Sequence, residues 1–305
     1  MTETKEKAVS CGMSPGDLLF WEHDGTAYML LFDTDPEPMN PRADDTPLAR
    51  LFCVGSHAHL GDQGNGTELG EFLLGIIERT MTREEIANRV RTLEDEKRIL
   101  IRTAAYETDD DLVNEILNEI SDGELEIREV DALLEGRAVI RPVWFYEHGG
   151  ITITCGDRVN QFSDSFDSGL FGWIVIDKDT VTRNLSNGNP DFDWEAIAVG
   201  RIEAEVDVYD QYLQGEVYRY ALYSGPMSNA DADTTDEDMW HDEDTVCGFY
   251  GNDVATNGMI DSMNVEESVK DALLDAIRNG TVERGHCKAQ PVVVYTFTRD
   301  GREEA

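Results

Sequence analysis

"DLLFWEHDGTAYMLLFDTD" (residues 17–35) predicts the first element of the fold, an antiparallel β-hairpin. Two apolar and aromatic runs flank Asp24-Gly25, and Asp-Gly favours the two-residue turns that join hairpin strands. A second hairpin is predicted in "AVIRPVWFYEHGGITITCG" (138–156), with Gly149-Gly150 at its turn. Hairpins of this kind build antiparallel sheets.

Helices are predicted between and after the two hairpins. In "TELGEFLLGIIERT" (67–80), apolar residues recur three and four positions apart, as on one face of a helix. Thr82 with Glu85, and Thr108 with Asp111, have the spacing of helix-capping residues. Further helices are predicted over 191–215 and over 264–280. The fold class is therefore expected to be α+β, with antiparallel β-hairpins packed against several helices.

The domain organisation is expected to follow the change from helices to strands near residue 136. A chain of 305 residues can form one large domain or two smaller ones. We expect a flexible tail over 1–15, an N-terminal α+β region over 16–135 and a C-terminal α+β region over 136–305. Within the last, "SGPMSNADADTTDEDMWHDEDT" (224–245) reads as an acidic loop.

The net charge of −38, from 63 acidic and 25 basic side chains, excludes ready binding to nucleic acids or anionic membranes. Three interpretations remain open. The first is a halophile-like composition that keeps a protein soluble in molar salt. The second is an acidic DNA mimic that occupies the DNA-binding groove of another protein. The third is acidity without a function. No apolar run is long enough to span a membrane and no secretory signal is recognisable, so a cytoplasmic location is expected.

"CVGSHAHLGD" (53–62) contains four metal-ligating residue types within ten positions: Cys53, His57, His59 and Asp62. On a strand, residues 53, 57 and 59 would point to the same face, which favours joint ligation of zinc or iron, with Asp62 or the distant His148 as a further ligand. The alternative is a strand with a core cysteine that leads into a Gly61-Asp62 turn. The acidic loop lacks the glycine of an EF-hand, so weak divalent-cation binding is the most it predicts, and no other cofactor is expected.

Five ordered strings resemble a family of uncharacterised proteins carried by phages and integrated mobile elements. They are "NPRADDTPLARLFCVGSHAHLGD" (40–62), "WFYEHGGITI" (144–153), "FDSGLFGWIVI" (166–176), "EVDVYDQYLQGEVYRYAL" (205–222) and "GFYGND" (248–253) followed by "NGM" (257–259). The resemblance implies no settled activity. In this pattern His57 and the Leu60-Gly61-Asp62 turn have counterparts, whereas His59 falls where an aromatic residue is usual.

The matching strings suggest a set of binding or structural residues, which line either a binding groove or a core supported by polar groups. They are His57, Asp62, His148, Asp167, Ser168, Tyr209, Asp210, Tyr212, Phe249 and Tyr250.

Two functions are carried forward from the sequence. The first is a non-enzymatic phage or mobile-element accessory protein, cytoplasmic in the host cell, that binds a host protein. In its most specific form it is an anti-defence (anti-restriction or anti-CRISPR) DNA mimic that binds a nucleic-acid-processing enzyme. The alternative is a metal-dependent hydrolase that uses Cys53, His57, His59 and Asp62.

Overall fold

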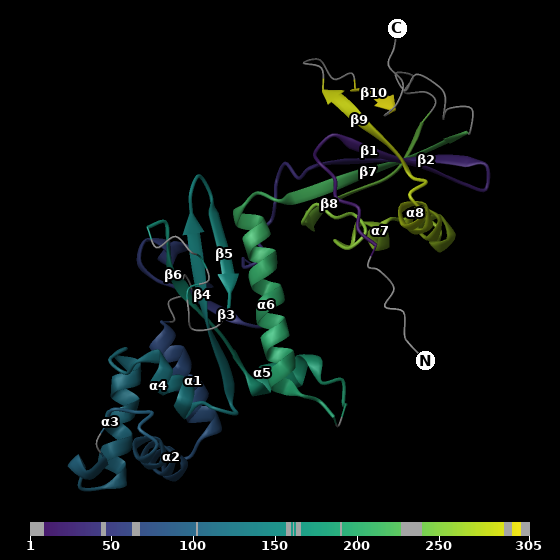
Figure 1. Cartoon of the computed structure of the whole chain (residues 1–305). Helices are drawn as coiled ribbons and strands as arrows, with labels where there is room; N and C mark the ends of the chain where they lie inside the picture. Colours follow the sequence, from purple (N-terminus) through teal and green to yellow (C-terminus); the bar gives the residue numbers. More distant parts are fainter. Residues whose placement is uncertain are drawn as a thin grey trace. The chain divides into compact units, whose positions relative to one another are not determined.

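The chain has an α+β fold, as predicted, in which two antiparallel sheets combine with helices (Figure 1). The computed structural model describes residues 9–43, 47–62, 68–101, 103–156, 160, 162, 166–189, 191–226, 240–289 and 295–299. In this part of the chain, no helix is long and apolar enough to cross a membrane.

Backbone contacts divide the chain into two compact units. The first contains residues up to Met39 and from Gln214 onward, and the second runs from Asn40 to Leu213. The second unit is inserted between β2 (Thr26–Thr34) and β7 (Val217–Pro226), two strands of the first unit that pair antiparallel. This division differs from the expected boundary near 136, which falls inside the second unit. Strand pairing between segments so distant in sequence leaves no signal in local residue patterns.

The first unit is built on a six-stranded antiparallel sheet in the order β10-β9-β1-β2-β7-β8. Its other strands are β1 (Asp17–His23), β8 (His241–Tyr250), β9 (Glu283–Ala289) and β10 (Tyr295–Arg299). The predicted hairpin is confirmed, since β1 pairs with β2 across Asp24 (φ 48°) and Gly25 (φ 77°). Both turn residues have the positive φ of a two-residue hairpin turn.

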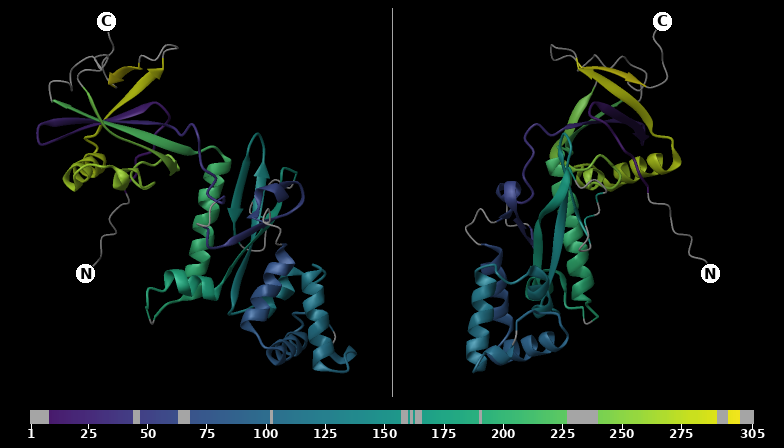
Figure 2. Two further views of the ribbon diagram at one scale, coloured as in Figure 1. Left: turned by 180° about the vertical axis from the view of Figure 1, so that it is seen from behind. Right: turned by 60° about the vertical axis from the view of Figure 1, so that its left-hand side comes forward.

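One face of this sheet packs against α7 (Met259–Ser262) and α8 (Glu267–Asn279), as Figure 2 shows. Alternate residues such as Leu19 and Trp21 point to that face, and their neighbours Leu18 and Phe20 lie in a separate cluster. α8 ends at Gly280 in a left-handed conformation, as predicted.

The described part of the expected flexible tail is anchored in this core. Cys11 and Met13 are both buried there. The Cys11 N–H donates to Asp253 Oδ1 at 2.8 Å, and the Met13 N–H donates to the Asn252 carbonyl at 2.9 Å. Residues 1–8, and residues 227–239 at the centre of the predicted acidic loop, lie outside the described residues. The ends of that loop, 224–226 and 241–245, belong to β7 and β8.

The second unit has a four-stranded antiparallel sheet with helices on both faces. Its strands, in the order β3-β6-β4-β5, are β3 (Arg50–Cys53), β6 (Ser168–Asp177), β4 (Ala138–Glu147) and β5 (Ile151–Cys155). The predicted hairpin over 138–156 is confirmed as β4 and β5. β6 requires glycine at position 172, because a Cβ there would lie 2.1 Å from the Phe52 carbonyl oxygen of β3.

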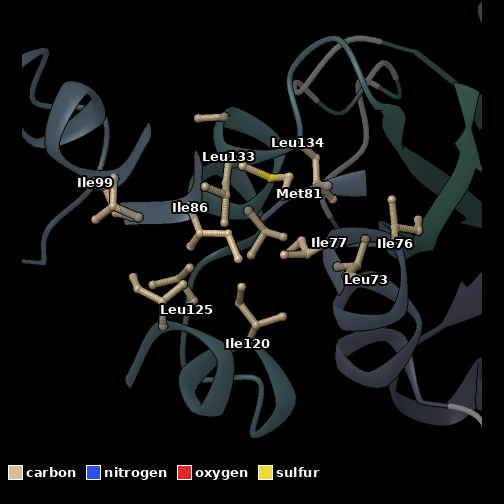
Figure 3. Packing of buried hydrophobic residues seen from close by; sticks show 14 of the residues in the cluster. Leu73, Ile76, Ile77, Met81, Ile86, Ile99, Ile120, Leu125, Leu133 and Leu134 are labelled. Carbon is tan, nitrogen blue, oxygen red and sulfur yellow. The ribbon is translucent and has the colours of Figure 1, made fainter. Parts of the chain in front are cut away.

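Four helices pack together in a bundle whose apolar cluster adjoins one face of this sheet: α1 (Leu69–Thr80), α2 (Arg83–Asp95), α3 (Asp109–Ser121) and α4 (Ile127–Leu133). Their apolar side chains form the cluster seen in Figure 3, which includes Leu73, Ile77, Ile86 and Ile120. The Thr82–Glu85 capping box is present, and the Thr108 hydroxyl accepts a hydrogen bond from the Asp111 N–H. A short 3₁₀ turn, η3 (Thr103–Ala105), precedes α3.

The opposite face is covered by α5 (Lys178–Leu185) and α6 (Trp194–Leu213). α6 contributes Ala198, Ile202, Val206 and Tyr209 to a core shared with β3 and β6. Burial alternates along the strands, because Val175 belongs to the α1–α4 side while Ile174 and Ile176 belong to the α6 side. The second unit is therefore a three-layer arrangement of helices, sheet and helices.

Candidate functional site

Several predicted residues meet where β4 turns into β5. We call this group the histidine cluster; it consists of His57, Glu147, His148, Asp167 and Ser168. Glu147 ends β4, His148 begins the turn, and Ser168 is the first residue of β6. The Glu147 N–H donates to the Asp167 carbonyl at 2.8 Å, which holds the two segments together. Four of the five were predicted, and Glu147 was missed because a strand-end carboxylate has no distinguishing pattern in an acidic chain.

His57 reaches the cluster from the 3₁₀ helix η1 (Gly55–Leu60). The residue is buried, and its ring lies 4.5 Å from the Phe145 ring and 5.3 Å from the Phe171 ring, centroid to centroid. Its Nε2 atom is 3.4 Å from Glu147 Oε2, a carboxylate that is half exposed. The His57 ring thus packs among buried aromatic rings, and its Nε2 atom lies near the partly exposed carboxylate of Glu147.

His148 forms a second histidine–carboxylate pair, and this one is exposed. Its Nδ1 atom lies 3.1 Å from Asp167 Oδ2. The neighbouring Ser168 hydroxyl accepts a hydrogen bond from Asn160 Nδ2 at 2.9 Å. A carboxylate that orients an imidazole is one part of an acid–base site, but the serine oxygen is held by an amide rather than by an imidazole.

The metal-site hypothesis does not agree with the geometry. Asp62 accepts two hydrogen bonds from the Arg42 guanidinium, at 2.9 and 2.5 Å, and one from the Leu51 N–H at 2.7 Å. His59 is exposed, with Nδ1 3.1 Å from the Ser56 carbonyl oxygen. Burial raises the pKa of the Cys53 thiol to about 12, which disfavours the thiolate that binds metals. Within the described ranges, no group of three or more His, Cys, Asp or Glu side chains could hold a metal ion.

Residues 57 and 59 lie in a 3₁₀ helix and not in the strand on which the metal-site hypothesis was based. β3 ends at Cys53, and Gly55 (φ 62°) starts η1 instead. Alternation by two residues places side chains on one face only in a strand. In a 3₁₀ helix, residues 57 and 59 are two-thirds of a turn apart, so their side chains diverge.

Asp62 and Tyr209 belong to a buried network that ties residues 40–62 to α6. The Arg42 side chain is 4% exposed and the Asp62 side chain 8%. Arg42 also lies 3.8 Å from a Glu205 oxygen and over the Tyr209 ring, 5.8 Å from its centroid. The Tyr209 hydroxyl donates to the Leu60 carbonyl at 2.8 Å, and burial raises its pKa far above the usual value. These contacts give Asp62 and Tyr209 a structural role.

The other predicted residues are also held in structural contacts. Asp210 Oδ1 accepts the Ile153 N–H of β5 at 2.6 Å, and the Tyr212 ring stacks on Tyr209 at 6.1 Å. Phe249 and Tyr250 lie in β8 of the first unit. The Phe249 ring packs 5.6 Å from Tyr220, and the Tyr250 hydroxyl donates to the Met39 carbonyl at 2.9 Å.

A surface not predicted from the sequence lies on α3 and on the turn that follows it. We call it the α3 acidic face; it consists of Asp111, Glu115, Glu119, Asp122 and Glu124. The first three are spaced four residues apart and so follow one line along the helix. Burial and the charges of Glu115, Glu124 and Glu129 raise the pKa of Glu119. No lysine or arginine of the described chain forms an ion pair with this face.

The arginines of α2 instead pair with carboxylates beside that face. Arg83 Nε contacts Asp110 at 2.9 Å, Arg91 contacts Asp109, and Arg89 contacts Glu135. These arginines are thus occupied, and no cation among the described residues compensates the row from Asp111 to Glu119.

No family model, no curated protein and no solved structure matches this chain.

Proposed function

We propose that the protein is a non-enzymatic accessory protein of a phage or mobile element that binds a basic surface of a host protein. The α3 acidic face is the observation that supports this proposal best. The motifs quoted above resemble proteins of phages and mobile elements, which supports that part of the proposal. The net charge of −38 favours a partner with a positively charged surface.

The α3 acidic face favours a cationic partner on energetic grounds. Like charges four residues apart on a helix destabilise it by about 0.2–0.5 kcal/mol per pair. Asp111–Glu115 and Glu115–Glu119 are two such pairs. An arginine or lysine of a partner relieves this repulsion and forms charge-assisted hydrogen bonds.

Tyr106 adds a second kind of contact beside the carboxylates. Burial and the charges of Glu115 and Glu119 raise the pKa of Tyr106, so its hydroxyl lies within their field. A half-buried ring next to carboxylates accepts a guanidinium by cation–π attraction. The combination selects arginine-rich partner surfaces.

The specific form of the proposal is an anti-defence protein that occupies the groove of a nucleic-acid-processing enzyme. Carboxylates four residues apart rise by about 6 Å along a helix, compared with about 3.4 Å between phosphates of one DNA strand. The row therefore has the sign of DNA at roughly half the linear charge density of a single strand. Such a mimic competes with DNA through its negative charge, and it needs further contacts to match the shape of the partner's groove.

The test compares two triple variants of the full chain against a partner isolated from the host and purified. One carries Asp111→Asn, Glu115→Gln and Glu119→Gln. The matched control carries Glu195→Gln, Glu203→Gln and Asp207→Asn, which removes three exposed carboxylates from α6. Titration calorimetry at about 0.15 M salt should show a loss of about tenfold or more in affinity for the first variant alone, since three contacts of ~0.5 kcal/mol each give that factor.

Equal losses in both variants, or none in either, would contradict the proposed face. The DNA-mimic form is tested separately. It requires that the isolated partner bind nucleic acid, and that the partner release the nucleic acid when this protein is added. A partner that binds tightly without this competition would refute the mimic form and leave protein binding intact.

A further inference from the structure

The bundle of α1–α4 adjoins the beginning of β4, whereas the turn between β4 and β5 lies at the far end of the sheet (Figure 1). Ala138 and Ile140, near the start of β4, belong to the apolar cluster of the bundle. On that side of the sheet the cluster reaches the paired residues Phe52 and Trp173, and the Phe72 ring of α1 lies 5.3 Å from the Phe52 ring. Two further rows of residues lie between this pair and the turn.

We call the surface formed by these two rows the aromatic tip face; it consists of Trp144, Tyr146, Thr152, Thr154, Ser168 and Leu170. Trp144 lies opposite Thr154 of β5 and Leu170 of β6. Tyr146 lies opposite Thr152 and Ser168 in the same way. Opposite residues of antiparallel strands point to one side, as do alternate residues along a strand, so the six side chains share one face. All six are half-buried.

Two more rings extend this face at the hairpin turn. The Tyr146 ring stacks on the His148 ring, with centroids 6.2 Å apart, and on the Phe162 ring at 5.7 Å. Asn160 holds this arrangement, because its Oδ1 accepts the Phe162 N–H at 3.0 Å and its Nδ2 donates to the Ser168 hydroxyl at 2.9 Å. The result is a patch of ring surface bordered by neutral hydroxyl and amide groups.

The aromatic tip face carries no charged side chain, although 29% of the residues in the chain are charged. At its border, the Asp167 carboxylate is paired with His148, whose Nδ1 lies 3.1 Å from Oδ2. The Glu147 carboxylate lies near His57, whose ring packs on Phe145 of the opposite face. Aromatic residues without charges are typical of the centre of a protein–protein interface.

The distribution of charge favours a second copy of this chain as the occupant. An arginine-rich surface finds carboxylates on the α3 acidic face but none among the six residues of the aromatic tip face. Two copies that each carry a net charge of −38 repel each other wherever their carboxylates meet. This repulsion is smallest where both contacting faces are uncharged, and a two-fold axis brings the same face of both copies together.

The neighbouring sheet edge is less suited to such an association. β5 is an edge strand of the four-stranded sheet, and edge strands can pair with a strand of another chain. Here Asp210 Oδ1 of α6 accepts the Ile153 N–H of β5 at 2.6 Å, so this edge donor is already used within the chain. Packing of face on face is therefore favoured over pairing of edge with edge.

We propose that two copies of the protein associate through their aromatic tip faces in a symmetric dimer, which becomes stronger as the salt concentration rises. The rings of Trp144 and Tyr146 form the centre of the contact, and the hydroxyls of Thr152 and Thr154 donate and accept hydrogen bonds around it. This inference does not rest on the proposed function, because it involves no residue of the α3 acidic face.

The experiment is sedimentation equilibrium of the full chain at about 5 to 500 µM, in about 0.15 M and about 1 M sodium chloride. Six residues a side are far fewer than in a standard interface, so a weak dimer with a Kd on the order of 10–100 µM is expected at the higher salt concentration. The screening length is about 8 Å at the lower concentration and about 3 Å at the higher, so the dimer should be at least about fivefold weaker at the lower one.

Variants then assign the dimer to this face. Thr152→Glu places two carboxylates close to each other across the contact and should weaken the dimer by about tenfold or more. Thr182→Glu is the matched control, since it adds the same charge at an exposed position of α5 and should leave the Kd unchanged. Tyr146→Ser removes a central ring and should also weaken the dimer by about tenfold or more. Far-ultraviolet circular dichroism checks the fold of each variant.

Hydroxyl-radical footprinting of the unmodified chain provides a readout that needs no substitution. Labelling of Trp144, Tyr146 and Phe162 should fall as the dimer forms, whereas labelling of exposed Leu100 should not change.

Four results would overturn the proposal. They are a monomer at every concentration and both salt concentrations, a dimer that weakens as salt rises, equal effects of Thr152→Glu and Thr182→Glu, and unchanged ring labelling in the dimer. A chain that stays monomeric, but whose ring labelling falls when a purified host partner is added, would assign the face to that partner and also overturn self-association.

Discussion

Replacing Arg42 by alanine removes the cation that neutralises Asp62 in the core of the second unit. The guanidinium donates two hydrogen bonds to Asp62 and one, at 2.8 Å, to the Ala49 carbonyl. In the variant, Asp62 keeps the Leu51 N–H as a donor but loses its charge partner. Glu205 keeps Arg201, whose Nε donates to it at 2.6 Å. The uncompensated charge is therefore that of Asp62.

The expected loss of stability is about 3–5 kcal/mol, the usual cost of removing one partner from a buried ion pair. With side-chain exposures of 4% and 8%, solvent does not screen this pair. A domain of this size loses about 2–4 °C of melting temperature per kcal/mol, so a decrease of about 6–20 °C is expected. Arg42→Lys keeps the charge but not the two-pronged geometry, and should fall between the wild type and Arg42→Ala.

The assay combines urea unfolding with amide hydrogen exchange of residues 40–62, where the Leu51 N–H reports on Asp62 directly. Arg83→Ala is the control, because it breaks an ion pair with Asp110 whose side chains are 48% and 78% exposed, and should cost less than about 1 kcal/mol. Combining Arg42→Met with Asp62→Leu should cost less than the sum of the two single substitutions. A loss below about 1 kcal/mol for Arg42→Ala, with unchanged exchange at Leu51, would refute the network as a stabilising element.

Three further predictions follow from local geometry. Gly172→Ala should destabilise the second unit by about 1–3 kcal/mol in urea unfolding, because the added Cβ meets the β3 backbone. Gly200→Ala, at an exposed position of α6, adds a Cβ that meets nothing within 4 Å and should stabilise the unit by about 0.5–1 kcal/mol. Thr82→Ala should cost about 1 kcal/mol through loss of the α2 cap, and an unchanged melting curve would argue against that cap. Site-mapped thiol labelling at pH 8 should modify exposed Cys247 quickly and leave Cys53 unmodified, since burial raises the Cys53 pKa to about 12; equal labelling would contradict its burial.

The sequence predicted those elements whose determinants are local. The Asp24-Gly25 and Gly149-Gly150 turns specified both hairpins, because the turn conformation depends on a few adjacent residues. The Thr82 and Thr108 caps marked helix starts for the same reason. The α+β class follows from these elements without any knowledge of how they pair.

The candidate sites were harder to predict because they depend on contacts between distant segments. His57 and His59 were expected on one face because side chains alternate along a strand. The segment instead forms a 3₁₀ helix that starts at Gly55, which has a left-handed backbone conformation. Arg42 lies within one of the quoted motifs, but nothing in the sequence pattern indicated that it would pair with Asp62. The α3 acidic face could be identified only once the arginines of α2 were seen to pair elsewhere.

Salt adaptation and partner binding make different demands on where the carboxylates lie. A coat that keeps a protein soluble in molar salt needs exposed carboxylates on all sides, and α6 supplies them at Glu195, Glu203 and Asp207 as α3 does at Asp111 and Glu115. At about 1 M salt the screening length is about 3 Å, so removing either set should then have the same small effect on the protein. A binding face must instead differ from the coat, because a partner desolvates its carboxylates and pairs them directly with arginines. The difference in affinity between the α3 and α6 triple variants therefore measures the functional part of the charge.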